Sequence, residues 1–372
     1  MQRVAVVFGG PSSEHDISIL TGLQAARLIS QAGKEVFPLY WDRSGAWHLV
    51  PLESEARDFI DGAPKQAVRV EPVLGPDGGW RTTKGLRPKH HRPEAVLSCF
   101  HGGYAEAGGG RAIFDAMALP STGGSLYAGA LSVDKLSFGA TMAAAGLPTL
   151  PRIALGKGQR TPDFDGPYIV KPRFGGSSIG IEIVEDLATA TGLTKQSVHL
   201  AAGAVIEPYR PDLYDLNIAV ITHPEFRTSY IEKPLREGDD SFYSYRDKYL
   251  HEAGLNRAPR EMPAPISDDL ADRIRSLAEQ VSDLVGLGSL ARLDFLSDGE
   301  QVFVNEVNNI PGALSLYLWP DDAPSQLLLG ALDQAVASFR TGQEIAGFAR
   351  GEALRAAGGI AGKLATLGTP NR

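Results

Sequence analysis

Three oxygen-bearing side chains near the C-terminal end of the sequence have the chemistry of metal ligands. Asp294 lies in the segment RLDFL, and Glu306 and Asn308 lie two residues apart in VNEVN. Alternate residues of a strand point to the same face, so Glu306 and Asn308 would share a face of a strand. Their oxygens suit a hard cation such as Mg²⁺, which leaves other positions to phosphates. Singly, each residue is more typical of a solvated surface or a turn. Together they indicate the metal half of a nucleotide site.

A glycine-rich stretch, KPRFGGSSIG at residues 171–180, indicates where phosphates would bind. Its glycines permit tight curvature, so that consecutive backbone N–H groups can converge on an anion. Ser177 and Ser178 add hydroxyl donors, and Lys171 adds a positive charge. The stretch lacks the Walker A pattern, and GGPSSE at residues 9–14 does not match G-x-G-x-x-G. A plain hairpin turn is the alternative, and the acidic residues favour a phosphate-binding loop.

Length and composition limit the class of protein. The chain has 372 residues, more than one hydrophobic core usually serves, which predicts two or three domains. With 43% hydrophobic and 22% charged residues and 42 glycines, it is typical of a globular α/β protein. A formal net charge of -8 argues against a nucleic-acid partner. The single cysteine, Cys99, lies in the apolar run EAVLSCF, which predicts a small core residue without a redox role.

The sequence gives no sign of a membrane partner. The N-terminal MQRVAVVFGG enters a strand directly and lacks the regions of a signal peptide. No apolar run reaches the length that spans a bilayer. We therefore expect a cytoplasmic protein.

Alternating strands and helices must position these residues. The run RVAVVF stops at a glycine turn before a helical pattern, and the strand AVLSCF ends at His101. Residues 66–84 alternate about a GPDGG turn, which predicts a hairpin. The segment 130–148 predicts one helix that is stopped by Gly146 and Pro148. A further helix is predicted at 267–287, before two final strands.

These elements predict a division of the chain into units. The predicted units are an N-terminal α/β substrate domain at 1–123, a central domain at 124–206, a C-terminal catalytic domain at 207–347, and a loosely held tail at 348–372.

Several motifs occur in the order found in one enzyme family. The sequence resembles the ATP-grasp carboxylate-amine ligases and, within them, the D-alanine-D-alanine ligase family. The resemblance extends over nearly the whole chain, through VAVVFGGPSSEHDIS, ALPSTGGSLYAGALSVDKL, IVKPRFGGSSIG, YRDKYL, RLDF and NEVNNIPG. It implies a three-domain α/β ATP-grasp fold that clamps ATP between its central and C-terminal domains. It also implies two Mg²⁺ ions, or Mn²⁺ in their place, amino-acid substrates and a homodimer.

The resemblance assigns the nucleotide and metal contacts residue by residue. The implied ATP-contacting residues are Lys135, Lys171, Ser178, Glu207, Asp215 and Lys248. Among them, Glu207 would lie near the adenine and Asp215 at the ribose. The implied metal ligands are Asp294, Glu306 and Asn308.

The chemistry of such a ligase defines the remaining roles. A carboxylate is a poor acyl donor, so ATP first converts it to an acyl phosphate, which the amine of a second substrate attacks. By resemblance, Arg292 and the backbone N–H of Gly312 would stabilise the oxyanion that forms. Glu14 would orient the ammonium group of the first substrate. Its alternative role is that of a favourable negative charge at the start of a helix.

Water must be kept from an acyl phosphate, which predicts a lid at residues 240–255. The stretch GDDSFYSYRDKYLHEAG is polar and rich in aromatic residues, with glycines at both ends that could act as hinges. By resemblance, Tyr249 in this lid would link to Ser177 and Glu14 and so close the site.

The sequence departs from the family pattern at two places. The segment HGGYAEAGGGRA keeps His101 and Glu106, but has Ala107 and Arg111 where the family commonly has Asp and Gln. Tyr317 stands where the family has a serine that helps hold the carboxylate of the attacking amino acid. The predicted substrate contacts are therefore His101, Ser315 and Tyr317.

Three alternatives to a D-alanine-D-alanine ligase stay open from the sequence. One is a related dipeptide ligase for a different amino acid in a specialised pathway, since a tyrosine ring at position 317 would reshape the acceptor pocket. Another is a non-catalytic ATP-binding regulatory protein, which would have little need for Glu14, Lys248 and Arg292 together. A kinase on the same fold would lack the amine-substrate site.

Overall fold

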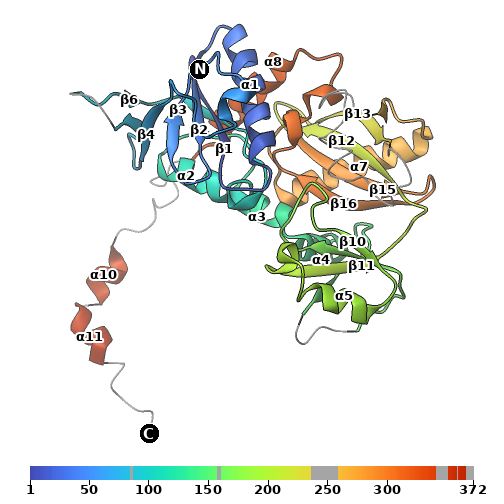
Figure 1. Cartoon of the computed structure of the whole chain (residues 1–372). Helices are drawn as coiled ribbons and strands as arrows, with labels where there is room; N and C mark the ends of the chain where they lie inside the picture. The colour runs from blue at the N-terminus through green and yellow to red at the C-terminus, as the bar shows by residue number, and fades with distance from the viewer. Residues whose placement is uncertain (84–86, 157–160, 236–258, 341–350, 358, 366–372) are drawn as a thin grey trace.

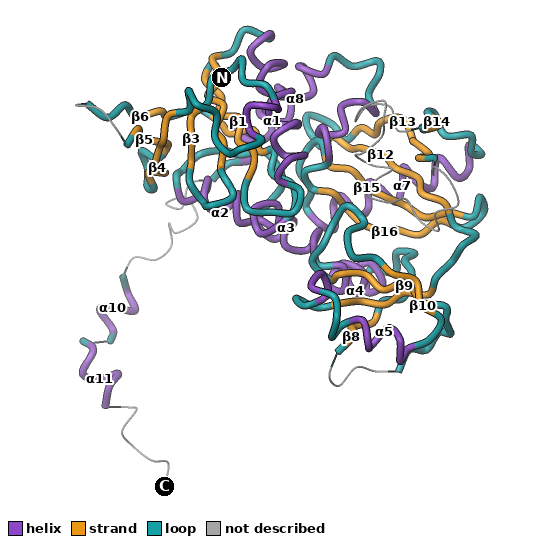
Figure 2. Tube along the Cα trace, viewed as in Figure 1, coloured by secondary structure: helices purple, strands orange, loops and turns teal. Residues whose placement is uncertain are grey.

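The structure is a computed structural model of the chain and describes residues 1–83, 87–156, 161–235, 259–340, 351–357 and 359–365. Within these residues the strands form three sheets, of seven, four and five strands. Helices cover the sheets, as Figures 1 and 2 show, so the predicted α/β class is confirmed.

The first sheet has the order β6-β5-β4-β3-β2-β1-β7. β1 (Arg3–Gly9) lies between β2 and β7 and is parallel to both. All but its first residue are buried, as its apolar, β-branched run predicts for a central parallel strand. The hairpin predicted at 66–84 is confirmed by the antiparallel pairing of β4 and β5. The other strands are β2 (Glu35–Trp41), β3 (Trp47–Leu49), β4 (Val68–Val73), β5 (Gly79–Thr82), β6 (His90–His91) and β7 (Ala95–Ser98).

The carboxyl edge of this sheet supplies the N-terminal part of the site. Parallel strands end at the same edge, so the segments after β1 and β7 lie together. Glu14 is the N-cap residue of the first helix, and His101 follows β7 closely. The helices of this part are α1 (His15–Gln31), η1 (Ala56–Phe59), η2 (Ala105–Gly109) and α2 (Gly110–Ala116).

The prediction of a single helix at 130–148 is wrong. The chain forms two helices there, α3 (Leu126–Val133) and α4 (Lys135–Ala144). Asp134 has an extended backbone, and its carboxylate accepts hydrogen bonds from two N–H groups in the first turn of α4. Arg173 pairs with the same carboxylate at 2.6 Å. The break places Lys135 in the first turn of α4, next to the glycine-rich loop.

The second sheet has the order β10-β9-β11-β8, and all its pairs are antiparallel. β9 (Tyr168–Pro172) and β10 (Glu182–Val184) flank the glycine-rich loop. The domain limit predicted between residues 206 and 207 falls inside β11 (Ala204–Pro208), so it would separate Glu207 from its own strand. The remaining elements are β8 (Ile153–Leu155), α5 (Leu187–Leu193) and η3 (Val198–Leu200).

The third sheet has the order β14-β13-β12-β15-β16. β15 (Ala291–Ser297) and β16 (Val302–Asn308) are antiparallel, with Asp294 opposite Glu306 and Arg292 opposite Asn308. The helix predicted at 267–287 is confirmed as α7 (Asp268–Val285), with a serine N-cap and a left-handed glycine after its last turn. The remaining elements are β12 (Tyr214–Ile221), β13 (Arg227–Pro234), β14 (Arg260–Glu261) and η4 (Gly312–Leu318).

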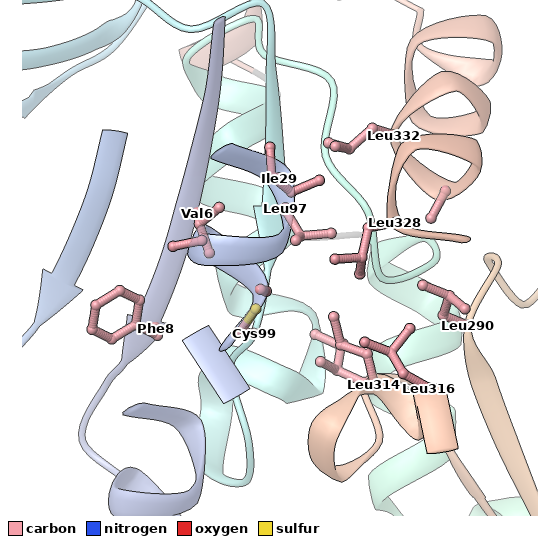
Figure 3. Close-up of a cluster of buried hydrophobic side chains, with 14 of the residues drawn as sticks. Val6, Phe8, Ile29, Leu97, Cys99, Leu290, Leu314, Leu316, Leu328 and Leu332 are labelled. Carbon is pink, nitrogen blue, oxygen red and sulfur yellow. The ribbon is translucent and has the colours of Figure 1, made fainter. Parts of the chain in front are cut away.

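A hydrophobic core joins the first sheet to the C-terminal part of the chain. α8 (Pro324–Ser338) and η4 pack against α1, and α8 also packs against β7. Figure 3 shows Leu97 of β7 close to Leu328 of α8, with Leu314 of η4 beside them. Cys99 is buried in the same cluster, which confirms its interpretation as a core residue. The turn that follows β16 is therefore held against the N-terminal sheet.

Two short helices lie within the predicted tail. Figure 1 shows α10 (Glu352–Ala356) and α11 (Ile360–Ala365) away from the three sheets. No residue of α10 is buried.

Candidate active site

A cavity of about 810 Å³ is lined by residues of the second and third sheets, and by residues of α1 and of the loops that follow β1 and β7 of the first sheet. Its size falls within the usual range of small-molecule sites. Ser315 does not line it, and Lys248 and Tyr249 lie outside the described residues, as does the whole of the lid predicted at 240–255. The predicted site residues that line the cavity are Glu14, His101, Lys135, Lys171, Ser177, Ser178, Glu207, Asp215, Arg292, Asp294, Glu306, Asn308, Gly312 and Tyr317.

We call Asp294, Glu306 and Asn308 the acidic cluster. Hydrogen bonds join two of its members to each other and one of these to Arg292. Arg292 donates from Nε and Nη2 to the two carboxylate oxygens of Asp294, at 2.6 and 2.7 Å. Asn308 Nδ2 donates to Asp294 Oδ2 at 2.9 Å. Burial opposes the charge of Arg292, but Asp294 raises the pKa of the guanidinium well above its ordinary value. Arg292 therefore keeps its positive charge beside the carboxylates.

The oxygen donors of this cluster fit a divalent cation. Glu306 lies directly opposite Asp294 on the neighbouring strand. Asn308 uses its amide nitrogen for Asp294 and therefore has an amide oxygen to offer as a ligand. In the described part of the chain, no group of three or more His, Cys, Asp or Glu side chains could hold a metal. Two carboxylates and an amide leave coordination positions for phosphate oxygens and water, which is how proteins usually bind Mg²⁺.

Two lysines bring positive charge to the cavity. Lys171 Nζ donates to Glu207 Oε2 at 2.8 Å, and both side chains are buried. Lys135 Nζ donates to the backbone carbonyl of Gly175 and lies 3.7 Å from Glu306 Oε2. Burial lowers the pKa of Lys135, and the charge of Glu306 opposes this shift. Lys135 thus connects the glycine-rich loop with the acidic cluster.

A third cation, Arg152, belongs to this group and was not predicted from the sequence. Its Nε lies 2.9 Å from Glu207 Oε1, and its Nη1 donates to the backbone carbonyl of Lys135 at 3.0 Å. Burial alone would raise the pKa of Glu207, but Lys171 and Arg152 hold it below its ordinary value. The stretch LPRIAL offered no motif that would have singled out this arginine.

The glycine-rich loop lies against Glu14. Ser177 and Ser178 have φ values of 54° and 58°, in the left-handed region that residues other than glycine rarely adopt. A Cβ added at Gly176 would lie 3.3 Å from a carboxylate oxygen of Glu14, so glycine permits this close approach. Glu14 makes no side-chain capping hydrogen bond at the start of α1. The loop and the first sheet therefore meet at this carboxylate.

His101 connects the first sheet to the turn after β16. Its Nδ1 lies 2.8 Å from the carbonyl oxygen of Ile310, which can only accept, so Nδ1 carries the proton. Nε2 then accepts from the hydroxyl of Thr21 at 2.9 Å, and that hydroxyl accepts from the N–H of Ala313 at 3.2 Å. Burial lowers the pKa of His101 to about 4. His101 is thus a neutral residue that fixes the turn after β16, which contains Pro311 and Gly312.

Glu106, which the sequence keeps from the family pattern, is close to Glu14. Its Oε2 accepts a hydrogen bond from the N–H of Gly102 at 2.6 Å. Burial, followed by the negative charge of Glu14, raises the pKa of Glu106 to about 8. The Glu106 carboxyl is therefore mainly protonated at neutral pH.

We expect Glu106 to make the stability of the protein depend on pH. The folded protein binds the Glu106 proton more tightly than the unfolded chain, in which the carboxyl titrates near 4.5. Its stabilising effect is fully present below that value and is lost as the pH rises to about 8. Glu106→Gln keeps an acceptor but cannot ionise, so it should flatten this part of the profile. Urea unfolding at a series of pH values measures the effect.

Glu279→Gln, on the exposed face of α7, serves as the control for this experiment. It should leave the pH profile of the unfolding free energy as in the parent protein. An unchanged profile for Glu106→Gln as well would contradict the assignment.

The structure separates the two residues predicted to contact the second substrate. Ser315 is buried, and its hydroxyl has no hydrogen-bond partner among the described residues. Tyr317 lines the cavity, but its hydroxyl donates to Glu232 Oε2 at 3.1 Å. Arg260 lies over the Tyr317 ring at 4.5 Å and pairs with Glu232 at 3.2 Å. The structure thus brings Tyr317 to the site and does not bring Ser315.

Part of the cavity wall is apolar and comes from two sheets. Such a surface suits the flat faces of a purine base, next to the buried carboxylate of Glu207. The apolar residues that line the wall are Ile169, Ile181, Pro208, Leu213 and Leu296.

Two family models match the chain. The model described as D-ala D-ala ligase N-terminus matches residues 3–124, and the model described as D-ala D-ala ligase C-terminus matches residues 155–326. The chain belongs to the D-alanine-D-alanine ligase family.

Similar proteins agree with this assignment. A D-alanine-D-alanine ligase from Mycolicibacterium smegmatis is 30% identical over 365 residues, which cover 90% of this chain and 95% of the relative. A D-alanine-D-alanine ligase from Chlorobaculum tepidum is 29% identical over 339 residues, which cover 86% of this chain and 91% of the relative.

Solved structures of D-alanine-D-alanine ligases and related enzymes share the fold. The ligase from Helicobacter pylori has a TM-score of 0.70 at 22% identity, covering 92% of this chain and 99% of that protein. The VanG D-Ala:D-Ser ligase from Enterococcus faecalis has a TM-score of 0.71 at 21% identity, covering 90% and 99%. These neighbours confirm the predicted ATP-grasp fold.

Membership in the D-alanine-D-alanine ligase family confirms the predicted enzyme class, an ATP-dependent, ADP-forming ligase. It favours this class over the regulatory protein and the kinase that the sequence left open. Among the described helices, none combines the length and the apolar character needed to cross a membrane.

Proposed function

We propose that this protein joins two D-alanine molecules into D-alanyl-D-alanine, with conversion of ATP to ADP and phosphate, for peptidoglycan synthesis. The observation that carries the proposal is that one cavity contains both chemical halves of such a reaction. Lysines and a glycine-rich loop suit the phosphates of ATP, while Glu14 and Arg292 suit an ammonium group and an oxyanion. The relatives that this chain matches over most of their length are named D-alanine-D-alanine ligase.

In the first step, a carboxylate oxygen of the first D-alanine attacks the γ-phosphorus of ATP and ADP leaves. Lys135 and Lys171 would neutralise phosphate charge, Ser177 and Ser178 would donate to phosphate oxygens, and Glu14 would hold the ammonium group of D-alanine. Glu207 and Asp215 would bind the adenine and the ribose. Asp294, Glu306 and Asn308 would hold Mg²⁺, which neutralises and orients the phosphates when bound. The number of ions, predicted as two, and the ability of Mn²⁺ to replace them belong to this proposal.

In the second step, the amine of the second D-alanine attacks the acyl carbon. The oxyanion of the tetrahedral intermediate would be stabilised by Arg292 and the N–H of Gly312. The intermediate then loses the proton of the attacking amine to solvent and expels phosphate, which leaves the dipeptide. The bond between Asp294 and Arg292 supports this role, because it fixes the direction of the guanidinium. Closure by Lys248 and Tyr249 stays a prediction.

A substrate panel tests the proposed function. The protein is incubated with ATP, Mg²⁺ and single or paired D- and L-amino acids, and ADP, phosphate and product mass are measured. We expect D-alanine alone to give ADP, phosphate and D-alanyl-D-alanine in equal amounts. ADP formation that does not depend on an amino acid, or that yields no dipeptide, would refute the proposal.

One observation favours a second candidate, a ligase for an acceptor other than D-alanine. The Tyr317 hydroxyl has one proton, which it donates to Glu232, so it is engaged away from a substrate carboxylate. Its ring also occupies space that a serine would leave open. We propose that position 317 tunes the choice of the second amino acid.

Tyr317→Ser is expected to change the acceptor preference. It removes the ring beside Arg260 and opens the pocket. The ratio of kcat/KM for D-alanine as acceptor to kcat/KM for larger amino acids should therefore change by about tenfold. The ratio of dipeptide products from mixed acceptors measures this shift. The control is Tyr230→Ser, an exposed residue on β13 that hydrogen-bonds to Asp321. A product ratio like that of the parent protein in Tyr317→Ser would show that this position does not select the acceptor.

The homodimer and the cytoplasmic location are also proposals. Light scattering of the purified protein measures the first, with a mass of twice 39.7 kDa expected. Fractionation of cells that make the protein measures the second.

A further inference from the structure

Arg152 is a buried cation that no step of the proposed reaction uses. It lies immediately before β8, and only 2% of its side chain is exposed. Burying a charge is costly unless it is paired, and an apolar residue often serves equally well for stability alone. The contacts of this guanidinium therefore indicate what it does.

The first contact is with Glu207, across the pair of strands β8 and β11. Arg152 Nε lies 2.9 Å from Glu207 Oε1, while Lys171 Nζ donates to Oε2 at 2.8 Å. The two cations hold the carboxylate from both sides. Oε1 is buried and has no aligned hydrogen-bond donor among the described residues, and Glu207 as a residue lines the cavity. An exocyclic amine of a purine base is a donor of the kind that a carboxylate accepts.

The second contact crosses to the third sheet. Arg152 Nη2 donates to the backbone carbonyl of Asn305 on β16, and Asn305 directly precedes Glu306. Nearby, Val304 donates its N–H to the carbonyl of Pro148 at 2.8 Å, so the segment before β8 runs along β16. Arg152 thus touches the strand that carries Glu306 and Asn308.

The third contact is with the start of α4. Arg152 Nη1 donates to the carbonyl of Lys135 at 3.0 Å, and its guanidinium lies 5.9 Å from the Phe138 ring. A Cβ at Gly139 would lie 2.6 Å from the Arg152 side chain, so α4 is shaped to admit it. One side chain therefore contacts the residues on either side of the nucleotide site and the backbone of a phosphate-binding lysine.

We propose that Arg152 is a positioning residue for the nucleotide. It holds Glu207 in the orientation that accepts the amino group of adenine, and it fixes the spacing between Glu207 and the strand of Glu306. The inference rests on the proposed ATP site and adds the residue that selects adenine over guanine. Guanine presents a carbonyl where adenine presents an amine, and a fixed carboxylate repels that carbonyl.

Nucleotide binding to the purified full-length protein tests this inference without requiring turnover. The dissociation constants of ATP and GTP are measured by calorimetry for the parent protein, Arg152→Met and Arg152→Lys. We expect Arg152→Met to weaken ATP binding about tenfold and to lower the preference for ATP over GTP about tenfold. Arg152→Lys keeps a charge near Glu207 but cannot contact Glu207, the Asn305 carbonyl and the Lys135 carbonyl at the same time. It should restore most of the ATP preference while binding ATP more weakly than the parent protein.

Arg227→Met is the matched control, because Arg227 also pairs with a carboxylate at 2.9 Å and lies over an aromatic ring, that of Trp319. It should leave both dissociation constants unchanged. Circular dichroism shows whether each variant folds, and Arg152→Lys keeps the test decisive if Arg152→Met does not. An unchanged ATP preference in a folded Arg152→Met, or ATP binding by Arg152→Lys as tight as in the parent protein, would overturn the proposal and leave Arg152 with a purely structural role. Failure of the parent protein to bind ATP would instead refute the proposed function.

Discussion

Glu306→Gln is expected to lower kcat for ADP formation about 10³-fold. The substitution keeps the shape of the side chain but removes one of the two carboxylate charges that face each other across β15 and β16. The proposed Mg²⁺ would be held more weakly, and Lys135 would lose the carboxylate 3.7 Å from its ammonium group. Initial rates over a range of Mg²⁺ concentrations measure the effect, and the half-saturating concentration should rise.

The matched control is Glu300→Gln, in the exposed turn of the same hairpin. It should retain the kcat and the Mg²⁺ dependence of the parent protein. If Glu306→Gln kept ATP turnover and an unchanged Mg²⁺ dependence, the metal assignment would be wrong.

Arg292→Lys is expected to lower kcat about 10²- to 10³-fold with a much smaller effect on ATP affinity. A lysine keeps the positive charge but cannot form the paired bonds at 2.6 and 2.7 Å that fix the guanidinium on Asp294. The charge would then be poorly directed toward the oxyanion of the second step. Steady-state kinetics give kcat, and calorimetry gives the dissociation constant of ATP.

Lysine is chosen because removing a buried charge would leave Asp294 unpaired, at a cost of about 3–5 kcal/mol in stability. Arg275→Lys, on the exposed side of α7, is the control and should leave kcat and the dissociation constant of ATP unchanged. A kcat within a few-fold of the parent value for a folded Arg292→Lys would remove this arginine from the proposed mechanism.

The grouping of the three proposed metal ligands was predictable because its signal is local. Asp294, Glu306 and Asn308 lie on short strands, where period-two alternation fixes which side chains share a face. The pairing of β15 with β16 then brings Asp294 opposite Glu306, which the sequence suggested but could not specify. The glycine-rich loop was equally predictable from the sequence, because glycine and serine at these spacings indicate a tight turn with many hydrogen-bond donors.

The contacts that depend on tertiary structure were not predictable. Arg152 meets Glu207 only because β8 pairs with β11, and a lone arginine before a short strand belongs to no motif. The Tyr317 hydroxyl likewise finds Glu232 on β13, far away in the sequence. Nothing local distinguishes an engaged tyrosine hydroxyl from one that awaits a substrate.

The break at Asp134 is a case in which one local signal overrode another. The apolar spacing from 130 to 148 favours one continuous helix, but an aspartate is also a strong N-cap residue. The bonds from Asp134 to the first turn of α4 and to Arg173 stabilise the capped form. Because the break sets Lys135 at a helix start beside the glycine-rich loop, it also shapes the proposed nucleotide site.

The central claim is that a carboxylate is activated as an acyl phosphate in this cavity. The most direct measurement uses D-alanine with oxygen-18 in its carboxylate, together with unlabelled ATP, and mass spectrometry of the phosphate released. In the proposed mechanism the carboxylate oxygen that attacks ATP leaves with the phosphate. We predict one labelled oxygen in each phosphate formed, in an amount equal to the dipeptide. Phosphate without label, released alongside dipeptide, would contradict the account.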